Sequence, residues 1–211
     1  MKKSQHIFIH IAKTAGGSIS SIMKQNGIAI DPTNQKPNDK EYLDLEYSWR
    51  DFRNFNSYEF DFSFAFVRNT YDRLVSAFHT PWVNPTAPNH KDQEVIASKE
   101  FSDFVKNFVL REKSYDFFRW SHVMPYFDER SKLFDSDGNQ RVSFIGEFEN
   151  LQEDFNFACK QMNIPILILP HEHKSERIHY TEYYDNQTRE IVAERYAKDI
   201  EYFGYEFGEQ T

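Results

Sequence analysis

The sequence predicts an α/β fold, with one domain over residues 1–211 and a central, mainly parallel sheet flanked by helices. Two apolar runs, Ile7–His10 and Phe62–Val67, have the β-branched and aromatic composition of buried strands. After each run, a short polar loop leads into apolar residues at helical spacing. Strands that alternate with helices indicate parallel pairing with helices on both faces of the sheet. Neither an internal repeat nor a clear linker divides the chain.

The first of these strand–helix connections is Lys13–Ser18, with the sequence KTAGGS. A strand, a glycine-containing loop and a helix present backbone N–H groups and a positive helix end to a phosphate. Lys13 adds a cation, and Thr14 and Ser18 add hydroxyl groups. The alternative is a tight turn in which Ser18 only caps the helix. A Walker A loop has its lysine after the second glycine, whereas Lys13 precedes both, so ordinary ATPase or GTPase chemistry is disfavoured.

The second connection follows Phe62–Val67 and leads into a helix expected at Tyr71–His79. Arg68 stands at the end of the strand, where a guanidinium reaches the crevice at the carboxyl edge of a parallel sheet. Ser76 lies further along the helix. An arginine with a nearby hydroxyl suits a phosphate monoester. The alternative makes Arg68 a salt-bridge residue at the helix start and Ser76 a surface serine.

The same kinds of sequence pattern predict the secondary structure of the rest of the chain. Helices are expected at Phe101–Leu110, Leu151–Met162 and Tyr183–Phe203, with Gly204 ending the last of them. A strand is expected at Val142–Ile145, and a strand or extended segment at Ile164–Leu169. Proline, asparagine and aspartate predict loops at Gly27–Asp39 and Thr80–His90 and a turn at Asp135–Asn139.

Composition restricts the class of protein. The 21 Phe and 12 Tyr predict an aromatic-rich core and aromatic pocket walls. A formal net charge of −8 argues against a general nucleic-acid surface, and no apolar run reaches the length of a membrane span. The apolar run at the N-terminus is too short for a signal peptide. The lone Cys159 excludes an internal disulfide and fits a reducing compartment, so we expect a cytoplasmic protein.

No metal site is expected either. His171 and His173 are spaced as a pair, but no cysteine or carboxylate completes a recognisable set of ligands around them. The sequence makes no prediction of oligomeric state.

Four segments, in the same order along the chain, resemble one family. IFIHIAKTAGGSI resembles the phosphosulfate-binding loop of sulfotransferases, and FAFVRNTYDRLVSAF resembles their 3′-phosphate motif. FIGEFENLQEDF and the stretch from HKSERIHY onward are similar to carbohydrate sulfotransferases and their bacterial relatives. The chain resembles the family 2 type, which includes heparan 2-O- and chondroitin sulfotransferases. The membrane anchor of Golgi members has no counterpart, which suggests a soluble bacterial or viral form.

The resemblance implies a P-loop-like fold, the donor 3′-phosphoadenosine 5′-phosphosulfate (PAPS), no metal, and transfer of a sulfuryl group to a hydroxyl of a carbohydrate acceptor. Lipid, tyrosine and small-metabolite acceptors stay open. By the match, the 5′-phosphosulfate would be held by Lys13, Thr14, Ala15, Gly16, Gly17 and Ser18. The 3′-phosphate would be held by Arg68 and Ser76, and Lys174, Ser175 and Arg177 would close over the nucleotide. Lys13 would also stabilise the charge that develops on the leaving phosphate.

Three positions depart from the family pattern. Ala12 and Thr70 stand where the family usually has proline, which reduces loop rigidity without removing a contacting group. Gly17 replaces a threonine or serine, which would remove one hydroxyl contact to the donor.

The acceptor needs a general base, and His122 is our prediction. It lies in the irregular segment Ser121–Arg130, and its His-x-x-Pro spacing is similar to a stretch that precedes the Phe-[Ile/Val]-Gly motif of the family. An imidazole with an ordinary pKa of about 6.5 accepts a proton well at neutral pH. His10, His79 and Glu59 are the rival candidates. Two other functions stay open: a P-loop-type nucleotide phosphotransferase, and an inactive nucleotide-binding module.

Overall fold

The computed structural model describes residues 6–28, 61–80, 83, 99–110, 120–128, 131, 133–170 and 177–209. The chain forms two compact units. Unit 1 comprises Met1–Val67 and Glu129–Lys174, and unit 2 comprises Arg68–Asp128 and Ser175–Thr211.

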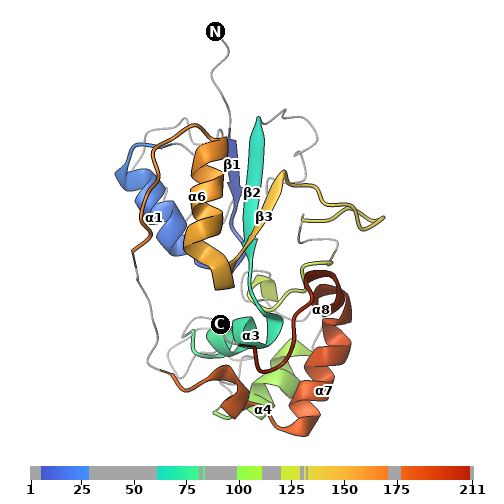
Figure 1. Ribbon diagram of the computed structural model, residues 1–211. Helices are drawn as coiled ribbons and strands as arrows, with labels where there is room; N and C mark the ends of the chain where they lie inside the picture. Colours follow the sequence, from blue (N-terminus) through green and yellow to red (C-terminus); the bar gives the residue numbers. More distant parts are fainter. Residues whose placement is uncertain are drawn as a thin grey trace, which may run out of the picture. The chain divides into compact units, whose positions relative to one another are not determined.

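Unit 1 is built on a parallel sheet in the order β1-β2-β3, with strands β1 (His6–Ile9), β2 (Phe62–Val67) and β3 (Phe144–Glu147) (Figure 1). The register pairs Phe8 with Phe64 and Phe64 with Phe144. The prediction of parallel strands is confirmed, and β2 has its predicted bounds. The third strand begins later than the predicted Val142. Just before it, the backbone N–H groups of Ser63 and Ser143 donate to each other's side-chain hydroxyl. Ser143 N–H donates to Ser63 Oγ at 2.9 Å, and Ser63 N–H donates to Ser143 Oγ at 3.2 Å.

Helices α1 (Gly16–Gln25) and α6 (Leu151–Gln161) pack side by side on one face of this sheet (Figure 1). That face carries Phe8, Phe62, Phe64 and Phe66, which are buried with Ile19 and Met23 of α1 and with Phe155, Ala158 and Cys159 of α6. Each buried phenylalanine contributes roughly 1.5–3 kcal/mol. The aromatic core is therefore confirmed. On the opposite face, Ala65 and Val67 are buried as well.

Gly146 allows α6 to lie this close to the sheet. A Cβ at this position would lie 2.6 Å from the ring of Phe66 and 2.9 Å from Cβ of Asp154. The 3₁₀ turn η4 (Phe148–Asn150) joins β3 to α6, and the Asp154 carboxylate accepts a hydrogen bond from Glu147 N–H at 2.7 Å.

The segment after α6, Ile164–Leu169, is not a strand. Leu167 and Leu169 are buried while Ile166 and Ile168 are exposed, so the residues alternate as in a strand. Their backbone is bonded instead to Gln152 of α6, which donates to Leu167 C=O at 3.1 Å and accepts from Leu169 N–H at 2.9 Å. A helix side chain thus takes the place of a neighbouring strand.

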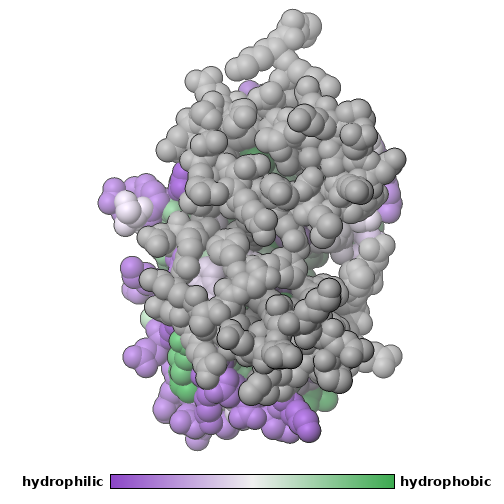
Figure 2. Space-filling model, turned by 180° about the vertical axis from the view of Figure 1, so that it is seen from behind, coloured by the Kyte–Doolittle hydropathy of each residue, from purple (hydrophilic) through white to green (hydrophobic). Residues whose placement is uncertain are grey.

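Unit 2 is helical in the part that the structure describes. It contains α3 (Thr70–Phe78), α4 (Phe101–Phe104), the π-helical turn η3 (Val105–Val109), the 3₁₀ turn η5 (Tyr180–Tyr183), α7 (Asn186–Arg195) and α8 (Ala197–Phe203). The predicted helix at Phe101–Leu110 is therefore half α and half π. Its buried face meets aromatic side chains of η5 and of the residue that follows it: the ring centroid of Phe101 lies 6.0 Å from that of Tyr183 and 4.7 Å from that of Tyr184. The exposed residues of α7 are polar or charged. Hydrophilic atoms surround a strip of hydrophobic ones at the lower left of Figure 2.

The prediction of one helix over Tyr183–Phe203 is wrong, because the segment breaks twice. Asp185 begins α7 with a capping box, in which its side chain accepts from Thr188 N–H at 2.7 Å. At Tyr196 the helix is interrupted where the buried ring donates its hydroxyl to Val123 C=O. Gly204 ends α8 in the left-handed conformation, with φ 67°, as predicted.

Several predicted features lie outside the described residues. They are Lys174, Ser175, Glu59, His171 and His173, the loop at Gly27–Asp39 beyond Ile28, and the loop at Thr80–His90 apart from Thr80 and Val83. The turn at Asp135–Asn139 is confirmed, since the Asp135 carboxylate accepts from Asp137 N–H at 2.9 Å and Asn139 N–H at 2.8 Å. Among the described helices, none is long and apolar enough to cross a membrane.

Candidate functional site

The connection from β1 to α1 has an unusual backbone. Lys13 (φ 70°) and Ala15 (φ 66°) both adopt the left-handed conformation, which non-glycine residues seldom take and which is frequent at functional sites. Between them, Thr14 is fully buried and donates its hydroxyl to Ile11 C=O at 2.8 Å. The Thr14 hydroxyl therefore supports the loop, and what this residue can offer to an anion is its backbone N–H.

The start of α1 has no side-chain cap. Its N-cap residue is Ala15, so Ser18 is not the cap that the alternative interpretation expected, and the helix begins at Gly16, three residues earlier than a Ser18 cap would place its start. The N–H groups of Gly16, Gly17 and Ser18 belong to the first turn, where a helix supplies no backbone acceptor. Such a helix start carries partial positive charge and suits an anion.

The two glycines differ in their surroundings. A Cβ on Gly16 would lie 2.0 Å from Cδ2 and 2.1 Å from Nε2 of His10, so this position must be glycine while the imidazole stays in place. A Cβ on Gly17 would meet nothing within 4 Å. Burial, together with the nearby Lys13 ammonium, lowers the pKa of His10 to about 4. At neutral pH, His10 is therefore an uncharged ring that packs against the loop.

In unit 2, the start of α3 is organised by side chains. Asn69 caps the helix by accepting from Tyr71 N–H at 3.1 Å. Arg68, which directly follows β2, donates Nε–H to Asp72 Oδ2 at 2.7 Å, and its Nη2 contacts the same oxygen. Tyr126 Oη accepts from Arg68 N–H and donates to Arg68 C=O, both at 2.9 Å. Arg68 is thus fixed at its backbone and at its side chain.

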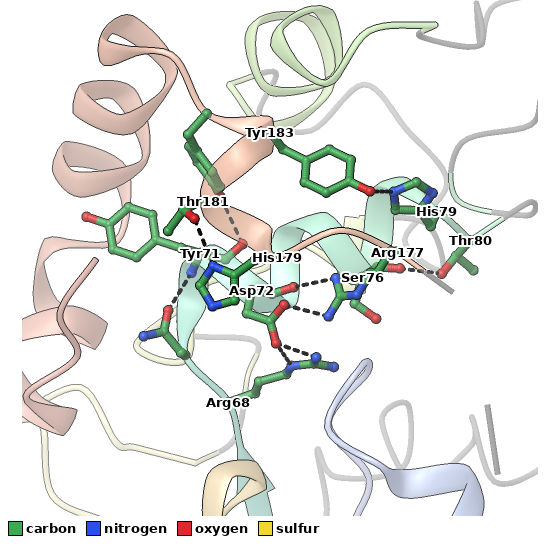
Figure 3. Close-up of polar contacts among 12 residues, drawn as sticks. Arg68, Tyr71, Asp72, Ser76, His79, Thr80, Arg177, His179, Thr181 and Tyr183 are labelled. Carbon is green, nitrogen blue, oxygen red and sulfur yellow. Dashed lines mark hydrogen bonds and ion pairs between the residues drawn. The ribbon is translucent and has the colours of Figure 1, made fainter. Parts of the chain in front are cut away.

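A second arginine shares the same carboxylate (Figure 3). Arg177 Nη2 donates to Asp72 Oδ1 at 2.5 Å, and Nη1 donates to Asp72 C=O at 3.5 Å. Ser76 lies one helical turn beyond Asp72 on α3, so the two residues share a face. The structure therefore brings Arg68, Ser76 and Arg177 together in unit 2. The ion pair between Arg68 and Asp72 is the salt bridge that the alternative interpretation expected of Arg68. Sequence reasoning did not name Asp72 as its partner, although a carboxylate four residues after an arginine is a signal for an ion pair.

His122 lies partly buried in a turn of unit 2. The residues after it are irregular, as predicted, but they are firmly held: Arg73 Nη2 donates to Met124 C=O at 2.8 Å. The Asp199 carboxylate accepts from Tyr126 N–H at 2.7 Å and from Phe127 N–H at 3.1 Å. His122 therefore adjoins a segment that is anchored to Arg68 through Tyr126.

Burial alters the charge behaviour of these anchors. It raises the pKa of the Tyr126 phenol to about 12, so the hydroxyl stays protonated and keeps its bond to Arg68 C=O. Burial also raises the pKa of Asp199 to about 6, against the opposing effect of the hydrogen bond from Tyr126 N–H and of the Arg73 guanidinium. Arg73 lies over the Tyr126 ring, 4.4 Å from its centroid.

The rival histidine in this unit, His79, follows α3. Its Nε2 is hydrogen-bonded to Tyr183 Oη at 2.9 Å (Figure 3). Burial and the Arg177 guanidinium lower its pKa. In the part of the chain that the structure describes, no group of three or more His, Cys, Asp or Glu residues is arranged to hold a metal ion.

The connections on either side of β2 lie within one family match. A sequence model of the sulfotransferase family matches residues 1–206 of the 211-residue chain. The chain belongs to the sulfotransferase family. Searches of curated proteins and of solved structures gave no match. The sulfotransferase is therefore a transferase of sulfuryl groups, and its matched region covers both the Lys13 loop and the Arg68 helix.

Proposed function

We propose that this sulfotransferase transfers the sulfuryl group of PAPS to a hydroxyl of a carbohydrate. The observation that carries the proposal is the grouping of Arg68, Ser76 and Arg177 in unit 2. Two guanidinium groups and a hydroxyl on neighbouring surfaces suit a phosphate monoester, which PAPS carries on its 3′ oxygen. The uncapped start of α1, with Lys13 beside it, suits the anionic 5′ end.

In this proposal the two ends of the nucleotide are bound by different kinds of hydrogen-bond donor. The backbone N–H groups of Lys13–Ser18 and the Lys13 ammonium hold the 5′-phosphosulfate. Arg68, Ser76 and Arg177 hold the 3′-phosphate, and Lys174 and Ser175 close over the nucleotide. Because the family match spans residues 1–206, we propose that both units act as one sulfotransferase domain.

The reaction is an in-line displacement at sulfur. The acceptor oxygen forms a bond to sulfur while the bond from sulfur to the bridging oxygen breaks, and that electron pair ends on the 5′-phosphate of the product, adenosine 3′,5′-bisphosphate. Negative charge grows on this phosphate, where Lys13 and the loop N–H groups stabilise it. The proton of the acceptor hydroxyl goes to the general base.

We propose His122 as that base. His10 packs against Gly16, and its pKa of about 4 makes it a weak base, while His79 already shares a hydrogen bond with Tyr183. A base must be deprotonated to act, so the rate should fall as the pH drops below its pKa. His122→Ala should abolish this acidic limb and most of the activity while leaving donor binding intact. A limb near pH 4 that persists in His122→Ala would assign the role to His10 or to Glu59 instead, and activity of the variants His10→Ala and Glu59→Gln would distinguish the two.

The test of the function is turnover of radiolabelled PAPS with a panel of carbohydrates, analysed for labelled products. The proposal predicts a labelled sugar and adenosine 3′,5′-bisphosphate in equal amounts, without added metal. Lys13→Ala is the control variant and should be nearly inactive. Labelling of a lipid or peptide in place of sugars would reject the acceptor class. Phosphate transfer from ATP that needs Mg²⁺ would reject the reaction, and binding without turnover of any acceptor would indicate an inactive module.

A further inference from the structure

Asp72 is the residue through which two distant arginines meet. Its side chain is 2% exposed, and each carboxylate oxygen engages a different guanidinium: Oδ2 engages Arg68, and Oδ1 engages Arg177 (Figure 3). The two arginines come from the two separate chain segments of unit 2, so the carboxylate is a shared anchor.

We infer that Asp72 is a positioning residue that fixes Arg68 and Arg177 as one clamp for the 3′-phosphate of the nucleotide. The inference rests on the proposed function, in which this phosphate binds in unit 2. Asp72 makes no contact with the ligand in this account and acts only through the two guanidinium groups.

The geometry of the ion pairs supports a positioning role. A guanidinium has five N–H donors in a rigid plane, and the bonds to Asp72 occupy two of them on each arginine. Fixing one edge of the plane sets the direction of the other edge. The Arg177 side chain is 14% exposed, and its remaining donors have no acceptor among the described residues. An anion can therefore reach this edge.

The anchor itself is held rigidly. Asp72 lies in the first turn of α3, where the helix dipole favours a carboxylate and where Asn69 caps the helix. Next to it, Tyr184 Oη donates to Tyr71 C=O at 2.9 Å. Long arginine side chains lose considerable rotamer freedom when they bind an anion, and a clamp that is already ordered lowers this cost on binding.

The test compares two nucleotides that differ only in the phosphate concerned. Calorimetry would give the dissociation constants of adenosine 3′,5′-bisphosphate and adenosine 5′-monophosphate, and their ratio reports the contribution of the 3′-phosphate. Asp72→Asn keeps the shape of the side chain and removes its charge. We expect it to lower the ratio by roughly tenfold or more, with the affinity for the monophosphate changed by less than about twofold. Asp103→Asn, the same change at an exposed position on α4, should leave the ratio unchanged.

The outcomes separate this inference from the proposed function. A wild-type ratio near one would overturn the 3′-phosphate site itself. A large wild-type ratio that survives in Asp72→Asn would overturn the role of Asp72 and leave the proposed function standing. Asp72→Glu provides a second test if the asparagine variant does not fold, because it keeps the charge and moves the oxygens by one methylene group. A positioning role predicts an intermediate ratio for this variant, and an unchanged ratio would contradict it.

Discussion

The β1–α1 and β2–α3 connections have the same supersecondary frame, a parallel strand that leads into a helix, but they offer different donors. The first uses its backbone: Lys13 and Ala15 are left-handed, and no side chain caps α1. The second uses side chains, because Asn69 caps α3 and the guanidinium groups of Arg68 and Arg177 are both held on Asp72. Fixed amides suit a group whose charge changes during reaction, and charged side chains suit a phosphate that is only recognised.

Among the variants that test this difference between the two connections, Lys13→Ala is expected to have the largest effect, a loss of kcat. If Lys13 stabilises charge on the leaving phosphate, kcat should fall by about 10²–10³, while the affinity for adenosine 3′,5′-bisphosphate falls much less. Steady-state kinetics together with calorimetry of the product would show this split. Normal turnover by the variant would mean that the backbone alone carries the stabilisation.

A smaller effect distinguishes the two glycines of the first connection. Gly16→Ala should lower the free energy of unfolding by about 1–3 kcal/mol, because the new Cβ displaces the ring of His10. Gly17→Ala, at an open position in the same helical turn, should be neutral or stabilise by up to about 1 kcal/mol. Chemical denaturation of the two variants measures the difference. Equal stabilities would contradict the close packing of His10 on Gly16.

Local sequence patterns were sufficient to predict much of the fold. Phe62–Val67 was predicted with its observed bounds because all six residues are buried, so an apolar run interrupted only by Ser63 marks the strand. The break in the C-terminal helix was not predictable in this way. It depends on Tyr196 and Asp199, which bond to Val123 and Tyr126 more than 70 residues away. The same holds for Gln152, which replaces a strand partner for Leu167 and Leu169.

In the candidate site, as in the fold, local sequence patterns predicted some features, and features that depend on distant residues were not predicted. Lys13–Ser18 form the start of α1 and the loop before it. The glycine-containing interruption of the apolar pattern predicted a strand–helix connection at this position. The left-handed Lys13 and Ala15 carry no local signal, because such backbone is usually marked by glycine. The pairing of Arg177 with Asp72 joins residues 105 positions apart, a contact that no periodicity reports. The role of His122 as the base stays a prediction.

The claim that the two connections bind different ends of the nucleotide is tested most directly by one ratio of dissociation constants, measured for the wild type and two variants. The ratio is that of the dissociation constants of adenosine 5′-monophosphate and adenosine 3′,5′-bisphosphate, measured by calorimetry for the wild type, Arg68→Ala and Lys13→Ala. The account predicts that Arg68→Ala loses about 2–4 kcal/mol of preference for the 3′-phosphate, as expected when a buried charged contact is removed. Lys13→Ala should keep the wild-type ratio within about twofold, since it acts at the other end of the nucleotide. An unchanged ratio in Arg68→Ala, or an equal loss in both variants, would contradict the account.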